Sequence, residues 1–140
     1  MSEPKIKVSF CLAGDNDNLD EITKLMEINP TKQRKKEDCP IMQFALTTWN
    51  LSTEKEYCKA VYWQFDKVLE KLKGKEEIIN EICKKYNFEA SFTVVVEMLV
   101  GNGPELVLTR DIISFASSIN AEIGFDLYID YIDYIDYIED

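Results

Sequence analysis

Apolar residues recur in this chain with two different periods, and the way the two periods alternate limits the folds that it can adopt. Alternate apolar residues indicate half-buried strands, whereas spacings of three and four residues indicate the buried stripes of amphipathic helices. Strands are expected at residues 6–12, 44–51, 92–98, 106–108 and 123–130. Helices are expected at residues 18–29, 53–73, 78–86 and 109–119, the last with Thr109 as its cap. The sequence therefore predicts an α+β protein with about five strands in a mixed, largely antiparallel sheet and about four helices packed on it.

Local signals set several of these boundaries. Thr53 and Glu56 have the spacing of a capping box, so the longest helix is expected to begin there, with Tyr57 on its buried face. The glycine- and proline-containing turn at residues 101–104 predicts a hairpin, in which residues 106–108 return along the preceding strand.

The chain ends in four copies of an aromatic, aliphatic and acidic triplet, at residues 128–139, followed by Asp140. If the last strand continued past the first copy, Asp133 would point toward the core, where an unpaired carboxylate is strongly unfavourable. The strand is therefore expected to end near Asp130. A single domain is predicted over residues 1–130, with an acidic tail over residues 131–140.

The composition argues against several classes of function. The chain has no histidine, so neither a Cys–His or Ser–His nucleophile pair nor a mixed Cys/His zinc site can form. Its net charge of −10 argues against a nucleic-acid partner, because nucleic-acid-binding domains normally present a basic surface. No apolar run is long enough to span a bilayer, and the first residues lack the pattern of a signal peptide. We therefore expect a cytoplasmic protein that does not enter a membrane, with no catalytic residue, no metal site and no cofactor.

Acidic residues gather in the turn after the first strand: Asp15, Asp17 and Asp20. The run resembles a calcium loop, but Leu19 and Met26 stand where such a loop needs an oxygen ligand and a glutamate. A turn whose acids favour the following helix dipole accounts for the same residues. An alternative is a small carboxylate-based enzyme or ligand-binding domain, in which these acids would converge with Trp49 or a lysine.

Basic residues form one cluster, within a polar stretch at residues 31–39 that is expected to be a loop: Lys32, Arg34, Lys35 and Lys36. Phosphate binding is one interpretation. Glu37 and Asp38 follow at once, however, so the pattern favours a solvated loop.

Some aromatic residues fall outside the predicted core. Trp63 lies off the apolar stripe of its helix, although packing against a neighbouring strand or loop is an equal alternative. Near the acidic end of the chain, further candidates for a binding surface are Tyr128, Tyr131 and Tyr134. Exposed Tyr and Trp beside acids are typical of protein interfaces, which these side chains often anchor.

Several short motifs, in this order along the chain, resemble the bacterial family of domain of unknown function 4279. They are Gly14-Asp15, Asp20-Glu21-Ile22-Thr23-x-Leu25, Pro30-Thr31, Trp49-x-Leu51-Ser52-Thr53, Ile119-x-Ala121-Glu122-Ile123 and Asp126-Leu127-Tyr128. Glu37 departs from that pattern, which has a glycine there, and the triplets from Tyr131 onward run past its usual end. The resemblance implies a small α+β domain and supplies no catalytic residues.

These observations favour a non-enzymatic protein-binding domain over an enzyme. By analogy with similar small bacterial families, it is expected to be an immunity protein that neutralises a toxin. The strong negative charge would speed the capture of a basic partner. A third alternative is a structural domain that self-associates, with its final strand paired across a homodimer; the sequence does not decide the oligomeric state.

Overall fold

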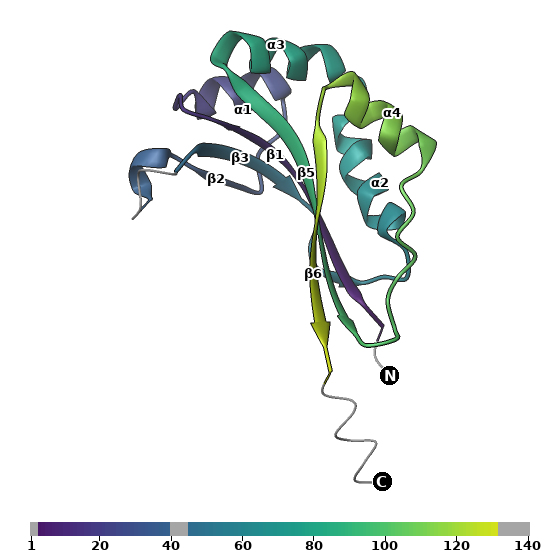
Figure 1. Ribbon diagram of the computed structural model, residues 1–140. Coiled ribbons are helices and arrows are strands. Elements are labelled where there is room, and N and C mark those ends of the chain that lie inside the picture. The colour runs from purple at the N-terminus through teal and green to yellow at the C-terminus, as the bar shows by residue number, and fades with distance from the viewer. Residues whose placement is uncertain (1–2, 40–44, 132–140) are drawn as a thin grey trace, which may run out of the picture.

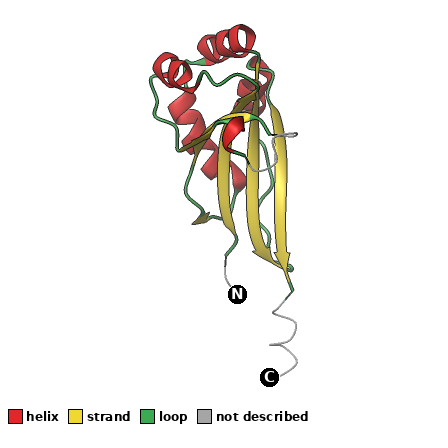
Figure 2. Ribbon diagram, turned by 90° about the vertical axis from the view of Figure 1, so that its left-hand side faces the viewer, coloured by secondary structure: helices red, strands yellow, loops and turns green. Residues whose placement is uncertain are grey.

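The computed structural model describes residues 3–39 and 45–131, and within them four α-helices pack on one face of a six-stranded mixed sheet (Figure 1). The predicted α+β class is therefore confirmed. Figure 2 shows the four α-helices on one side of the sheet, and no α-helix of the described residues covers the other side. We call this uncovered side the open face.

The sheet is built around two long central strands. Its strands are β1 (Lys5–Gly14), β2 (Lys32–Arg34), β3 (Thr47–Ser52), β4 (Glu56–Tyr57), β5 (Phe88–Leu99) and β6 (Glu122–Asp130). Their order is β2-β3-β1-β5-β6, and β4 pairs with the beginning of β1. All pairings are antiparallel except β5 with β6, which is parallel. β2 and β6 are therefore the edges of the sheet as far as the structure describes it.

The helices cover the sheet in two groups. They are α1 (Leu19–Met26), α2 (Val61–Leu72), α3 (Glu76–Tyr86) and α4 (Arg110–Ser118), and a short 3₁₀ helix, η1 (Lys36–Asp38), follows β2. In Figure 1, α1 and α3 lie together over one end of the sheet, whereas α2 and α4 lie together beside its middle. None of the helices in the described ranges has the length and apolar character needed to cross a membrane.

The core lies between the helices and the sheet. Alternate residues of β1 point into it, including Phe10, which contacts the Phe92 ring at a centroid distance of 5.3 Å. Phe65 of α2 packs on the other side of Phe92 at 4.9 Å. Each large apolar side chain buried in this way contributes about 1.5–3 kcal/mol, so these layers hold the helices on the sheet.

The longest helix begins later than predicted. α2 starts at Val61, and Thr53 does not cap it: the hydroxyl of Thr53 accepts a hydrogen bond from the Val8 backbone N–H at 3.0 Å. Glu56 and Tyr57 form β4 instead of a first helical turn, and Tyr57 is exposed. The capping-box interpretation was wrong because the Thr53 hydroxyl binds the neighbouring strand β1.

The predicted hairpin after β5 is also absent. Residues 106–108 form no strand, and the nearby Glu105 makes a single parallel bridge with Ala60. Both edges of β5 are already occupied by β1 and β6, so no edge remains for a returning segment. The stretch at residues 31–39, predicted to be a loop, contributes the short edge strand β2 and η1.

Several other boundaries are confirmed. Thr109 caps α4, its hydroxyl accepting a hydrogen bond from the Ile112 N–H at 3.4 Å. Gly74, at a positive φ of 79°, separates α2 from α3. The final strand ends at Asp130, as expected. Phe44, where the second strand was predicted to begin, lies outside the described residues.

Candidate functional site

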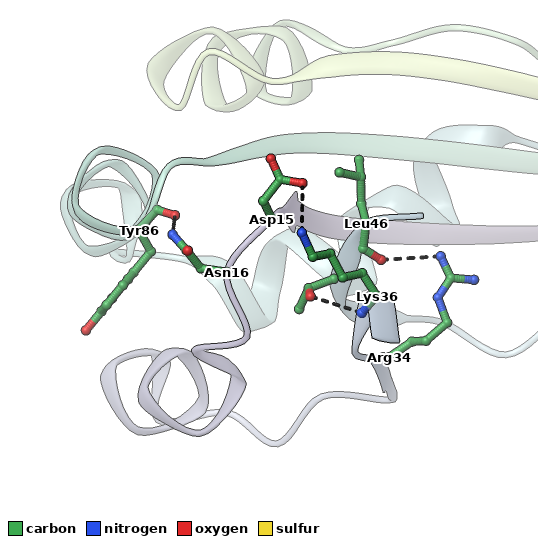
Figure 3. A network of polar contacts seen from close by, with 7 residues as sticks. Asp15, Asn16, Arg34, Lys36, Leu46 and Tyr86 are labelled. Atoms are coloured by element: carbon green, nitrogen blue, oxygen red, sulfur yellow. Dashed lines mark hydrogen bonds and ion pairs between the residues drawn. The ribbon is translucent and has the colours of Figure 1, made fainter. Parts of the chain in front are cut away.

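The acids of the first turn do not form a pocket. Asp15, Asp17 and Asp20 are exposed, and none of them lines any of four sizeable hollows in the described part of the chain. The Asp15 carboxylate faces the Lys36 ammonium at 3.6 Å, and the neighbouring Asn16 side chain donates to the Tyr86 carbonyl oxygen at 2.7 Å (Figure 3). Through these contacts the turn is held against η1 on one side and against the end of α3 on the other.

The two tryptophans lie in different environments. Trp49 of β3 is fully buried, and its indole N–H donates to the Thr23 hydroxyl at 2.9 Å, so it presents no surface to a ligand. Trp63 of α2 is 54% exposed and makes an edge contact with Tyr62 at a centroid distance of 6.1 Å. Trp49 is therefore enclosed in the core, whereas Trp63 lies on the surface.

The largest group of exposed apolar side chains on one strand belongs to β6. Phe125, Leu127 and Ile129 point to the helix side of the sheet, yet each is more than 40% exposed. The reason is visible in Figure 1, where β6 continues past α2 and α4. The prediction that these residues share the helix side of the sheet is confirmed, but no described helix covers most of them.

Tyr128 and Tyr131 extend this exposed region. Tyr128 is 54% exposed on the open face of β6, and Tyr131 follows the strand with a 68% exposed side chain. The third predicted tyrosine, Tyr134, lies outside the described residues. The outer edge of β6 has no strand partner within the described part of the chain.

A row of four side chains crosses the open face at this end of the sheet. Tyr57, Lys5, Glu97 and Tyr128 stand side by side on β4, β1, β5 and β6. The Lys5 ammonium lies 5.0 Å from the centre of the Tyr57 ring, which is within the range of a cation–π interaction. Glu97 also pairs with Lys55. Lysine and aromatic side chains therefore surround the carboxylate at the centre of this row.

Tyr128 is held in place from within its own strand. Its hydroxyl donates to the Asp126 carboxylate at 2.9 Å, and that hydrogen bond, followed by the negative charge of Asp126, raises the pKa of the phenol above its ordinary value. Tyr128 is therefore a neutral hydrogen-bonding aromatic at physiological pH.

Beside this row lies a hollow of about 640 Å³, which we call the terminal hollow. Its walls are the ends of the long strands, the beginning of the chain and β4; they comprise Glu3, Lys5, Tyr57, Glu97, Met98, Leu99, Leu127, Tyr128, Ile129 and Asp130. Apolar, aromatic and charged groups thus meet at the point where β6 leaves the cover of the helices. This mixture is typical of surfaces that bind a protein segment.

The charge along β6 has one sign. Glu122, Asp126 and Asp130 share its open face, and the strand contains no lysine or arginine. Within residues 3–39 and 45–131, no group of three or more Cys, Asp or Glu side chains is placed to hold a metal ion. The site can therefore bind through backbone, aromatic and acidic groups.

Sequence reasoning identified Tyr128 and Tyr131 but missed their neighbours in space. Lys5, Tyr57 and Glu97 come from three distant segments, and only the register of β1 with β4 and β5 places them in one row. The helical spacing predicted that Tyr57 would be buried, whereas its place in β4 exposes it.

The fold and this site define a small α+β domain with helices on one face of a mixed sheet and a free, acidic edge strand. The chain matches the model of a family described as a domain of unknown function (DUF4279) over residues 4–130, and it belongs to that family. The match ends with β6 and leaves the triplets from Tyr131 onward outside it. No curated protein and no solved structure matches the chain.

Proposed function

We propose that this domain is a non-enzymatic protein-binding module that binds a basic partner at the outer edge of β6. The observation that carries the proposal is the edge strand β6, whose outer edge has no strand partner in the described chain and whose large apolar side chains are exposed. Free edges of this kind readily pair with a segment of another protein, and the side chains beside them supply specificity.

A partner bound at this edge would contact exposed residues on both faces of β6. Phe125, Leu127 and Ile129 would contact it on the helix side, while Tyr128 and the acids would contact it on the open face. The terminal hollow lies against the same end of the strand and can receive a side chain from the partner. Apolar area supplies affinity here, and the acids select a partner with lysine or arginine.

The charge pattern favours a different protein over a second copy as the occupant of this edge. In an antiparallel pair of β6 strands with continuous sheet faces, the acids of one copy would lie opposite or diagonal to those of the other. Like charges in such positions destabilise a strand pair. Glu122, Asp126 and Asp130 therefore oppose self-association, although the exposed edge by itself would permit it.

The specific case that we propose is an immunity protein, with a basic toxin as the partner. The net charge of −10 supports it, because a negative surface steers a basic protein toward this domain at low ionic strength. The acids of the first turn give little support to a carboxylate-based enzyme, since all three are exposed, Trp49 is fully buried, and the contact of Asp15 with Lys36 lies outside those four hollows.

The test is co-expression with the products of neighbouring genes, followed by size-exclusion chromatography and a growth assay. The informative variants are Leu127→Lys and Tyr128→Ala on β6. Trp63→Ala is the matched control, because Trp63 and Tyr128 have the same exposed fraction of 54%. We expect a complex, and rescue of growth where the neighbour is toxic, with the wild type and Trp63→Ala but not with the β6 variants.

Two results would contradict the proposal. If no neighbouring product binds and none is neutralised, the protein-binding function is wrong. If Trp63→Ala abolishes a complex that both β6 variants keep, the domain binds proteins but through α2. Sedimentation velocity on the isolated domain tests the alternative: a concentration-dependent dimer that Leu127→Lys abolishes would favour a self-associating structural domain.

A further inference from the structure

The open face carries a second hollow, of about 500 Å³, over β1, β2 and β3. Three other sizeable hollows in the described part of the chain have glutamate or aspartate in their walls. This one has no acid and contains three cations: Lys7, Lys32 and Arg34. In a protein of net charge −10, such a concentration of positive charge identifies a distinct surface, which we call the basic hollow.

The three cations stand at the two ends of the basic hollow. Lys32 lies opposite Asn50, which in turn lies opposite Cys11, so β2 supplies one end. Lys7 lies four residues before Cys11 on β1, a distance of about 13 Å along a strand. None of the three cations makes an ion pair with a residue that the structure describes. Their charges are therefore available to a ligand.

Hydroxyl groups form the floor between these ends. The Ser9 and Ser52 hydroxyl oxygens are 2.7 Å apart, so one donates to the other and the accepting hydroxyl keeps its own proton for a ligand. Thr31 lies beside them, and its hydroxyl accepts a hydrogen bond from the Ser52 N–H at 3.0 Å. Hydroxyl donors between separated cations are suited to the oxygen atoms of an extended anion.

The β2 end of the basic hollow is fixed to the rest of the sheet. The Arg34 guanidinium donates to the Leu46 carbonyl oxygen at 3.5 Å, and the Lys36 backbone N–H donates to the Thr47 hydroxyl at 3.2 Å (Figure 3). Arg34 also reaches over the sheet: burial raises the pKa of the Cys11 thiol, and the positive charge of Arg34 opposes that rise. These contacts hold a basic edge strand in place without neutralising it.

We propose that the basic hollow binds the diphosphate group of a small molecule. Lys32 and Arg34 would bind one phosphate, Lys7 the other, and the Ser9 and Ser52 hydroxyls would donate to the oxygens between them. The Cα positions of Lys7 and Lys32 differ by about 13 Å along the strands and by two strand spacings across them, about 16 Å in all, so a diphosphate bridges the two lysine side chains more readily than a single phosphate. The volume of the basic hollow is within the range of ordinary small-molecule sites. This site is separate from the β6 edge and does not depend on the protein-binding proposal.

The test uses titrations of the full chain with pyrophosphate, inorganic phosphate and ADP, followed by amide chemical shifts and calorimetry. We expect pyrophosphate to bind at least about tenfold more tightly than phosphate. The largest shifts should occur at Lys7, Ser9 and Ser52. ADP should retain the affinity of pyrophosphate if the natural ligand is a nucleotide, and weaker binding of ADP would indicate a smaller diphosphate.

Three charge-removing variants make the test specific. Arg34→Gln should weaken the binding of both anions by about tenfold, while Lys7→Gln should weaken pyrophosphate alone and make it resemble phosphate. Lys35→Gln is the matched control, because Lys35 belongs to the same segment but does not line the basic hollow. It should change neither affinity.

Several outcomes would overturn the proposal. They are the absence of any shift up to about 10 mM pyrophosphate, equal affinity for phosphate and pyrophosphate, and an effect of Lys35→Gln as large as that of Arg34→Gln. An effect of Lys35→Gln of that size would indicate that the anions are attracted to the positive charge of the whole segment instead of to a specific site. Circular dichroism checks the folding of each variant; Arg34 and Lys35 are exposed, and Lys7 is half-buried.

Discussion

At the scale of single residues, Gly14 is a position where the surrounding atoms leave no room for a side chain. A β-carbon added there would overlap the Phe88 ring and lie 2.8 Å from the Asn87 carbonyl oxygen, where β1 meets the start of β5. The ring can turn but the backbone cannot, so Gly14→Ala should lower the free energy of unfolding by about 1–3 kcal/mol. Gly124→Ala is the control, because no atom lies within 4 Å of its added carbon. Urea denaturation measures both, and equal stability of the two variants would contradict this account.

A second residue-scale prediction concerns Asp66 of α2. Partial burial, and then the charge of Asp111 on α4, raise the pKa of its carboxyl. The folded state therefore binds this proton more tightly than the unfolded state, and the resulting stability is lost as pH rises through the folded pKa. Asp66→Asn should raise the free energy of unfolding at pH 7, by no more than about 0.5 kcal/mol because the residue is exposed. The gain should vanish at about pH 3, below the ordinary pKa of aspartate; an equal gain at both pH values would rule out the electrostatic cause.

At the scale of secondary structure, α4 depends on its cap. The Thr109 hydroxyl satisfies the Ile112 N–H, one of the donors that a helix leaves free at its start. Thr109→Ala should therefore lower the free energy of unfolding by about 1 kcal/mol, whereas Thr109→Ser should keep most of it. Thermal unfolding followed by circular dichroism compares the two, and a serine variant as unstable as the alanine variant would show that packing matters here instead of capping.

The contrast between Thr109 and Thr53 shows that a local sequence signal for a helix start is not sufficient to predict where the helix begins. Both threonines were predicted to begin a helix, yet only the Thr109 hydroxyl accepts a hydrogen bond from the helix that follows it. Thr53 lies beside β1, where the Val8 N–H uses its hydroxyl. Periodicity identified four helices and the long strands, because each of them buries one face. The short strands β2 and β4 escaped it, since all five of their residues are exposed and carry no apolar alternation.

The candidate sites were less predictable because they depend on strand order. The parallel pairing of β5 with β6 leaves one edge of β6 free, and nothing within residues 122–130 distinguishes that arrangement from an antiparallel one. Lys32 belongs to the basic cluster that the sequence shows, but Lys7 does not, and the two share a hollow only because β1, β3 and β2 are adjacent. Tyr128 was predictable because its alternation with Ile129 set it outside the core.

At the scale of the whole molecule, charge is segregated across the open face. Lys32 and Arg34 lie at the β2 edge, whereas Glu122, Asp126 and Asp130 lie at the β6 edge. The overall negative charge of −10, which argued against a nucleic-acid partner, does not reveal this division. A basic protein and a phosphate-bearing molecule would therefore approach different edges of the same sheet, and the two proposals can be tested independently.

The last prediction concerns the C-terminal end of the folded domain. The pairing of β6 with β5 ends at Asp130, opposite Leu99, where the Val100 N–H donates to the Asp130 carbonyl oxygen at 3.0 Å. A chain ending at Asp130 keeps all of these contacts and should unfold within about 2 °C of the full chain in scanning calorimetry. A chain ending at Gly124 loses the pairing of six residues of β5 and should be destabilised by much more. A fall of more than about 5 °C for the first truncation would place residues after Asp130 in the folded domain.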